Sequence, residues 1–224
     1  MARPAPPRLD SPELAADKAQ AIALMGDFVS RETWERLDAY AAMLIERQHV
    51  TNLIAPSTIP SLWTRHVADS LQLLALAPEA RKWVDLGAGG GFPGLAIACA
   101  LSGQKGAAVH LVESRQKKAA FLSDVVSALS LPAIVHCQRI EDFSAEPRAK
   151  FDVVTARALA PLDKLIGYAI PLLKKGAVGL FPKGQDVEAE LTHASKSWTL
   201  ETDLIPSKTD PHARIVRVSR AAKC

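Results

Sequence analysis

The sequence predicts an α/β protein with a doubly wound, seven-stranded and mostly parallel sheet, preceded by a helical extension. From residue 81 onward, short apolar runs alternate with helix-forming runs, and the last two strand candidates have no helix between them. Before residue 81, apolar residues recur at the spacing of amphipathic helices. We therefore expect a disordered tail at 1–10, a helical extension or lid at 11–80 and the sheet domain at 81–224.

The extension contains two helix start signals. Ser11 followed by Pro12 is an N-cap with proline at the first helical position. Residues 30–33 (SRET) open a second helix with capping-box character, and both Glu32 and Thr33 fit the frame of that box. The apolar face of this second helix is expected to comprise Trp34, Leu37, Tyr40, Ala41, Leu44 and Ile45.

One further helix, or two short ones, is predicted over 58–76, and strands and helices then alternate. The strand candidates are 83–86, 108–112, 133–137, 151–155, 177–181, 198–205 and 213–218. The helix candidates of the sheet domain are 93–101, 115–129, 161–173 and 185–195. The segment PSKTDPHA at 206–213 is predicted to be the turn of an antiparallel hairpin at the sheet edge.

Composition excludes several classes of protein. The hydrophobic content of 48% suffices for a full core, and no apolar run reaches the length of roughly 18 residues that a membrane span needs. The Pro-rich start is not a signal peptide, so we expect a cytoplasmic protein, and we expect it to be a monomer. Cys99, Cys137 and Cys224 are widely spaced and the six histidines show no ligand pattern, so we expect no disulfide framework and no metal.

Charge is unevenly distributed along the chain. The net charge is +3, but residues 1–80 carry 7 basic and 10 acidic side chains, whereas residues 81–224 carry 20 basic and 14 acidic ones. The basic excess favours a phosphate-rich partner for the sheet domain. A solvated surface without a partner explains the same numbers. Lys117 and Lys118 are open to both interpretations.

The stretch KWVDLGAGGGFPGLAIACA at 82–100 combines a buried strand, a glycine turn and the start of a helix. This geometry places ligand oxygens on backbone N–H groups. Dinucleotides and S-adenosylmethionine are the two cofactor classes that use it. The match of residues 89–94 to G-x-G-x-x-G is weak evidence for a dinucleotide.

One acidic position and the terminal hairpin favour S-adenosylmethionine over a dinucleotide. Asp85, two residues before Gly87, would repel a pyrophosphate but suits the cationic amino-acid tail of S-adenosylmethionine. Glu113, after the second strand, can accept the ribose hydroxyls of either cofactor. Ile140 and Glu141 lie where methyltransferases usually hold adenine, although a solvated turn would also explain Glu141. The terminal antiparallel hairpin is typical of class I, Rossmann-like methyltransferases rather than of dehydrogenases.

The segment after the fourth strand, FDVVTARALAPLDKLI, restricts the methyl acceptor. It lacks the Asp/Asn-Pro-Pro-aromatic motif of enzymes that methylate exocyclic amines. It also lacks the cysteine nucleophile that methylation of pyrimidine C5 requires. A nucleophile with a free lone pair, such as guanine N7, needs only alignment and charge stabilisation.

The chain resembles the RsmG (GidB) family of bacterial small-subunit rRNA guanine-N7 methyltransferases. The most specific elements are 65–70 and 155–158, and the resemblance covers about 34–218. Thr155 and Pro182 stand where the family often has Ser and Leu, and neither difference removes a charge. The segments that carry the resemblance are NLIAPSTIPSLWTRHVADSLQLL, VDLGAGGGFPGLAIA, VESRQKKAAFL, RIEDF, TARALAPLDKLI and FPKG.

The resemblance implies methylation of N7 of guanine 527 in 16S rRNA, with S-adenosylmethionine as the cofactor and 16S rRNA or the small ribosomal subunit as the partner. Together with the residue-level arguments, it predicts a site in three groups. These are catalytic Arg157, Lys183, His66 and Asp69; cofactor-binding Asp85, Gly87, Gly89, Gly91, Phe92, Glu113, Ile140, Glu141 and Arg157; and RNA-binding Asn52, Arg139 and Lys183.

Alternatives remain open for the residues and for the function. His66 and Asp69 lie three positions apart on a predicted helix, so a hydrogen bond that fixes the extension explains them as well as substrate placement does. Arg157 could simply form an ion pair with a neighbouring acid. The chain could also methylate a small molecule or a protein, or bind RNA without catalysis. The complete set of Asp85, the glycines and Glu113 argues against a non-catalytic role.

Overall fold

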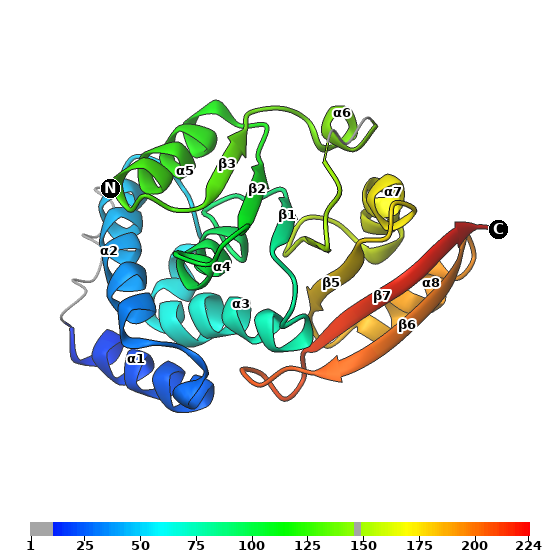
Figure 1. Ribbon diagram of the computed structural model, residues 1–224. Helices are drawn as coiled ribbons and strands as arrows, with labels where there is room; N and C mark the ends of the chain where they lie inside the picture. Colours follow the sequence, from blue (N-terminus) through cyan, green and yellow to red (C-terminus); the bar gives the residue numbers. More distant parts are fainter. Residues whose placement is uncertain (1–10, 146–148) are drawn as a thin grey trace.

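The computed structural model, which describes residues 11–145 and 149–224, confirms the predicted α/β architecture (Figure 1). Its seven strands form one sheet in the order β3-β2-β1-β4-β5-β7-β6. The first five strands are parallel, and β7 runs antiparallel between β5 and β6. The strands are β1 (Lys82–Leu86), β2 (Ala108–Val112), β3 (Ala133–His136), β4 (Val153–Thr155), β5 (Val178–Lys183), β6 (Trp198–Pro206) and β7 (Arg214–Lys223).

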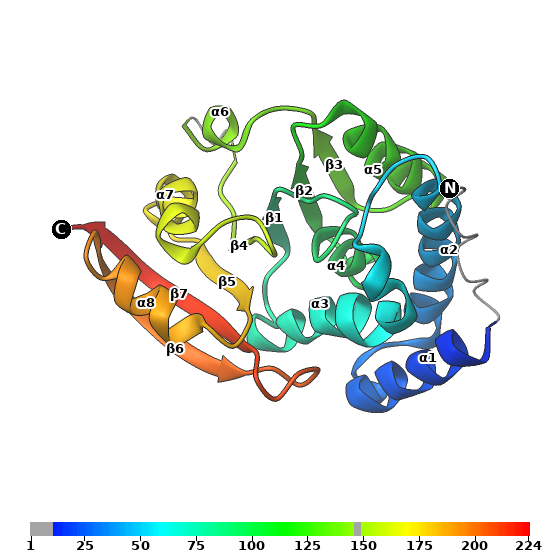
Figure 2. The same ribbon diagram turned by 180° about the vertical axis from the view of Figure 1, so that it is seen from behind.

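Helices cover both faces of the sheet (Figures 1 and 2). One face carries α4 and α5 with the extension outside them, and the other carries α6, α7 and α8. The helices are α1 (Pro12–Met25), α2 (Arg31–Gln48), α3 (Asp69–Leu71), α4 (Gly94–Leu101), α5 (Gln116–Ala128), α6 (Ile140–Ala145), α7 (Leu162–Leu173) and α8 (Val187–Ala194). Short turns of other pitch are η1 (Gly26–Phe28), η2 (Pro56–Ser61), η3 (Trp63–Ala68) and η4 (Gln72–Leu76).

The central strand β1 explains why both faces need a cover. Trp83 packs into the core beneath α4, whereas its neighbour Val84 and also Leu86 pack into a second core shared with α7. Successive side chains of a strand point to opposite faces, so a strand with large apolar side chains on both faces must be covered on both. The strand order reverses between β1 and β4, which places a crevice at their carboxyl ends.

The extension packs against the sheet domain rather than standing apart from it. Leu14, Leu37 and Leu71 belong to the same buried cluster as Leu95 of α4. The predicted caps are confirmed: Ser11 accepts a hydrogen bond from the backbone N–H of Leu14, and Ser30 accepts one from that of Thr33. The second bond settles the frame of the α2 cap in favour of Thr33. The expected tail at 1–10 lies outside the described residues.

Residues 56–76 differ from the predicted one or two helices. The chain stays helical throughout, but its pitch changes from 3₁₀ in η2 to π in η3, to α in α3 and back to 3₁₀ in η4. Asp17 of α1 holds the start of η3, because its carboxylate accepts hydrogen bonds from Trp63 N at 2.7 Å and from the Thr64 hydroxyl. Turns of π pitch are frequent at functional sites.

Two further elements depart from prediction. Helix α6 was not predicted, since six residues are too few to show a helical period. Strand β7 runs to Lys223, five residues beyond the predicted end at 218, and a register shift between Glu201 and Thr202 accommodates its length against β6. Within the described residues, no helix is long and apolar enough to cross a membrane.

Candidate cofactor and substrate site

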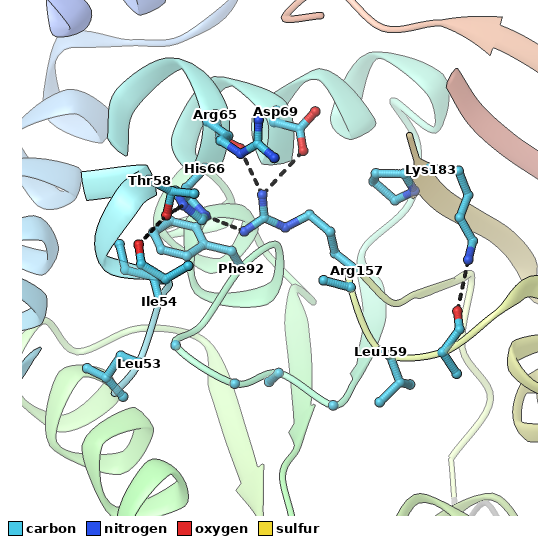
Figure 3. A pocket seen from close by; sticks show the side chains of 18 of the residues that line it. Leu53, Ile54, Thr58, Arg65, His66, Asp69, Phe92, Arg157, Leu159 and Lys183 are labelled. Atoms are coloured by element: carbon cyan, nitrogen blue, oxygen red, sulfur yellow. Dashed lines mark hydrogen bonds and ion pairs between the residues drawn. The ribbon is translucent and has the colours of Figure 1, made fainter. Parts of the chain in front are cut away.

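The carboxyl ends of the parallel strands open into a cavity of about 1110 Å³. Its wall combines the glycine turn at 87–92, the segments that follow β2 and β4, and the loop and helical turns at 53–69 (Figure 3). The turn between β6 and β7 closes one end. Among the described residues, no group of three or more His, Cys, Asp or Glu side chains could hold a metal.

The glycine turn leaves backbone bare where it faces the cavity. Gly89 has a φ of +57°, and a Cβ added there would meet nothing nearer than the Gly87 oxygen at 3.7 Å. The turn therefore offers space for a ligand at Gly89. Gly91 serves packing instead, because a Cβ there would collide with Leu95 and with the Tyr40 hydroxyl. Gly91 is not in the cavity wall.

Asp85 lies behind the turn and not in the cavity wall, although the sequence suggested direct contact with the cofactor. Its side chain is 1% exposed and accepts hydrogen bonds from Gly94 N and the Thr155 hydroxyl, both at 3.0 Å. Burial raises the pKa of Asp85 to about 7, against the opposing effect of these two hydrogen bonds. Asp85 thus ties the start of α4 to the end of β4.

Glu113 lines the cavity beside the glycine turn. Its two carboxylate oxygens accept backbone hydrogen bonds from Gly89 N at 3.0 Å and Arg115 N at 2.7 Å. Each oxygen keeps a second lone pair, so the side chain is both fixed and able to accept further bonds. Ile140 and Glu141, at the start of α6, line the same part of the wall.

Arg157 joins strand β4 to the extension (Figure 3). It donates hydrogen bonds to Nδ1 of His66 at 2.5 Å and to the backbone oxygen of Arg65 at 2.8 Å, and it pairs with Asp69 at 3.4 Å. Its guanidinium carbon also lies 5.6 Å from the centre of the Phe92 ring. The sequence left Arg157 open between a role in the site and an ion pair with a neighbouring acid, and the pair with Asp69 shows that this ion pair forms. His66 and Asp69 meet at this guanidinium.

His66 and Asp69 are both largely buried at this junction. Burial, followed by the charges of Arg157 and Arg65, lowers the pKa of His66 to about 3, so its imidazole is neutral at physiological pH. Burial raises the pKa of Asp69, and the charge of Arg157 opposes that rise. Asp69 also accepts hydrogen bonds from Thr209, at 3.0 Å, and Gln72, at 2.8 Å. It therefore links the extension to the turn between β6 and β7.

The other predicted residues, Lys183, Arg139 and Asn52, lie apart from the junction at Arg157. Lys183 lies in the cavity wall at the end of β5, paired with Glu190 at 2.7 Å and donating to Ala160 O at 2.9 Å. Arg139 also lies in the wall, just before α6. Asn52 does not: it is exposed on the approach to the loop at 53–58, and its side chain accepts a hydrogen bond from Gln48 at 3.1 Å.

Three further cations that were not among the predicted site residues line the cavity: Arg65, Arg115 and Lys118. For Lys118 the sequence had left a phosphate contact and a solvated surface both open. Together with Arg139 these three cations form the cationic wall. Within residues 11–145 and 149–224, none of these four side chains has an ion pair. The signal available in the sequence was the position of Arg115 and Lys118 directly after the strand end that carries Glu113.

Solved structures share this fold. TomG of Streptomyces achromogenes, an O-methyltransferase solved in complex with SAM, superposes with a TM-score of 0.58 at 15% sequence identity, covering 91% of this chain and 97% of the other. An O-methyltransferase of Bacillus cereus in complex with SAH gives a TM-score of 0.56 at 17% identity, covering 92% and 97%. These two solved structures show that the fold of this chain is that of class I, Rossmann-like methyltransferases.

Sequence comparison identifies the family. The family model described as rRNA small subunit methyltransferase G (GidB) matches residues 33–214, and the chain belongs to this family. A protein named ribosomal RNA small subunit methyltransferase G in Bradyrhizobium sp. (strain BTAi1) is 57% identical over 205 residues, covering 92% of this chain and 91% of the relative. A protein of the same name in Methylorubrum populi is 53% identical over 195 residues, covering 87% and 92%.

Proposed function

We propose that this enzyme transfers the methyl group of S-adenosylmethionine to N7 of guanine 527 in 16S rRNA. One observation carries the choice of acceptor: every titratable side chain of the predicted catalytic group, where the extension meets the ends of β4 and β5, is already engaged. His66 is neutral and bonded through Nδ1, Asp69 accepts three hydrogen bonds, and Lys183 is paired with Glu190. An acceptor that gives up no proton suits such a site, and guanine N7 is one.

The residues of the glycine turn fit the cofactor. The open space at Gly89 suits a ligand close to the backbone, and the fixed carboxylate of Glu113 has lone pairs left for two ribose hydroxyls. Ile140 and Glu141 would flank the adenine. Bound there, S-adenosylmethionine supplies a methyl group activated by a positively charged sulfur. Asp85 would act from behind, by holding the turn in shape.

The cationic wall supports an RNA substrate. The guanidinium and ammonium groups of Arg65, Arg115, Lys118 and Arg139 have no ion pair with any described residue, and they suit phosphates that cross the mouth of the cavity. The names of the relatives also point to ribosomal RNA of the small subunit. We therefore propose 16S rRNA, free or within the small subunit, as the partner of a monomeric, cytoplasmic enzyme, with Arg139, Lys183 and Asn52 on its RNA-facing side.

The test is transfer of tritium from methyl-labelled S-adenosylmethionine to small subunits that lack the modification, followed by digestion to nucleosides. The label should appear in 7-methylguanosine. The Gly89→Val variant should transfer none, because a branched side chain at a φ of +57° both strains the turn and fills the space next to it. Label in an exocyclic amine, on a ring carbon, or only in protein or small molecules would refute the proposed acceptor.

A further inference from the structure

A chain of hydrogen bonds runs from the end of β4 to the loop at 53–58 (Figure 3). Arg157 Nη2 lies 2.5 Å from Nδ1 of His66, Nε2 of His66 lies 2.8 Å from the Thr58 hydroxyl, and that hydroxyl lies 2.7 Å from the backbone oxygen of Ala55. These groups belong to three parts of the cavity wall: the segment after β4, the η3 turn and the loop at 53–58, whose last residues form the first turn of η2. Thr58 was not among the predicted site residues.

The direction of every bond in this chain is fixed. Arginine can only donate, so Nδ1 of His66 accepts. The neutral ring therefore carries its proton on Nε2 and donates it to the Thr58 hydroxyl. The hydroxyl in turn donates its own proton to Ala55 O. Both ring nitrogens are used, and His66 has neither a free lone pair nor a free proton to offer a substrate.

The loop at the end of this chain lies over the glycine turn. The backbone oxygen of Leu53 is 3.0 Å from the position of a Cβ added at Gly90, so loop and turn are in close contact. Gln48 of α2 fixes the near end of the loop, because its side-chain oxygen accepts from Leu53 N at 2.9 Å and Ile54 N at 3.1 Å. Thr58 lies at the far end, where its backbone N–H and its hydroxyl both donate to Ala55 O, at 2.9 and 2.7 Å. Only the hydroxyl also contacts His66, so it is the tie between this end of the loop and η3.

We propose that Thr58 is a positioning residue for methyl transfer, which acts through His66 to fix Arg157 and the far end of the loop relative to the glycine turn. Gln48 keeps the cofactor side of the loop in place independently. Loss of the Thr58 hydroxyl should therefore impair turnover rather than cofactor binding. The inference shares its site with the proposed function, but it concerns total methyl transfer and holds for any acceptor.

The test compares three variants of the full chain. Thr58→Val keeps the shape and removes the hydroxyl, and Thr58→Ser keeps the hydroxyl. Thr51→Val makes the same change at a residue outside the cavity wall. We expect Thr58→Val to lower kcat roughly tenfold, the effect of losing the partly buried hydrogen bond to His66. The dissociation constant of S-adenosylmethionine should change less than about twofold, and Thr58→Ser and Thr51→Val should match the wild type.

A second readout does not depend on activity. Nitrogen-15 NMR of the histidine rings at pH 7 should show His66 protonated at Nε2, with a slowly exchanging Nε2 proton that persists in Thr58→Ser and is lost in Thr58→Val. The inference is overturned if wild-type His66 carries its proton on Nδ1, if Thr58→Val turns over normally, or if Thr58→Ser is as impaired as Thr58→Val. A methyl group found at a nucleotide other than guanine 527 would refute the proposed function and leave these comparisons intact.

Discussion

Two buried titratable side chains, Asp85 and His66, have strongly shifted pKa values in and behind the site. Asp85 and His66 are both displaced toward their neutral forms, with pKa values of about 7 and about 3. The sequence identified both residues through their places in the glycine turn and the extension. It could not assign their roles, because the partners Thr155, Gly94 and Thr58 are brought to them only by the fold.

The raised pKa of Asp85 makes a prediction for stability. A carboxyl group with a raised folded-state pKa contributes stability that is full below its usual value of 3.8 and is lost as the pH rises through about 7. Asp85→Asn removes this contribution but can still accept from Gly94 N and donate to the Thr155 hydroxyl. The unfolding free energy of the wild type minus that of Asp85→Asn should therefore decrease between about pH 4 and pH 8.

Urea denaturation of both proteins across this range measures the difference. Taking the difference also cancels the effect of His66, whose lowered pKa destabilises the fold as the pH falls from 6.5 toward 3. A difference that increases with pH would mean that the carboxylate is favoured in the folded state, contrary to its burial.

At the scale of secondary-structure elements, periodicity predicted the regular parts and failed at the irregular ones. The two caps at Ser11 and Ser30 and the alternation of strands and helices follow from local chemistry. The pitch changes across 56–76 do not, since they depend on contacts with α1, and Asp17 supplies one of them from 46 residues away in the chain. These pitch changes place His66 and Asp69 at the cavity, so this part of the site could not be predicted.

Asp17 provides the prediction at this scale. Asp17→Ala removes the acceptor for Trp63 N and the Thr64 hydroxyl, and should lower the free energy of unfolding by about 1–3 kcal/mol. Gln20→Ala, an exposed position on the same helix, should change it by less than about 0.5 kcal/mol. Chemical denaturation measures both values. Equal stability of the two variants would show that α1 docks through its apolar face alone.

Charge and topology act together over the whole molecule. The basic excess of residues 81–224 suggested a phosphate-rich partner, but its location emerges only when the ends of β2 and β3 bring Arg115, Lys118 and Arg139 to one cavity. Arg65 reaches the same cavity from the extension. The resemblance of the sequence to its family predicted Arg139 and Lys183. The fold pairs Lys183 with Glu190, whereas Arg139 has no ion pair with the part of the chain that the structure describes.

The cationic wall predicts a strong dependence of RNA binding on salt. The association constant for 16S rRNA should fall steeply with ionic strength. In a plot of the logarithm of this constant against the logarithm of the salt concentration, Arg115→Ala should make the slope less steep by about 0.7 to 0.9. Arg31→Ala is the control, because Arg31 is paired with Glu35 on α2 and lies outside the cavity. Filter binding at several salt concentrations measures both slopes. Salt-insensitive binding would indicate a substrate without phosphates.

The central claim is that the methyl group reaches N7 of one guanine. Borohydride–aniline treatment cleaves RNA selectively at 7-methylguanine, so primer extension on treated 16S rRNA maps the modification to a single nucleotide. After incubation of unmodified small subunits with the enzyme and S-adenosylmethionine, we predict one new cleavage, at guanine 527, that is absent without the cofactor. Incorporation of the methyl group into the rRNA without any new cleavage would contradict the claim.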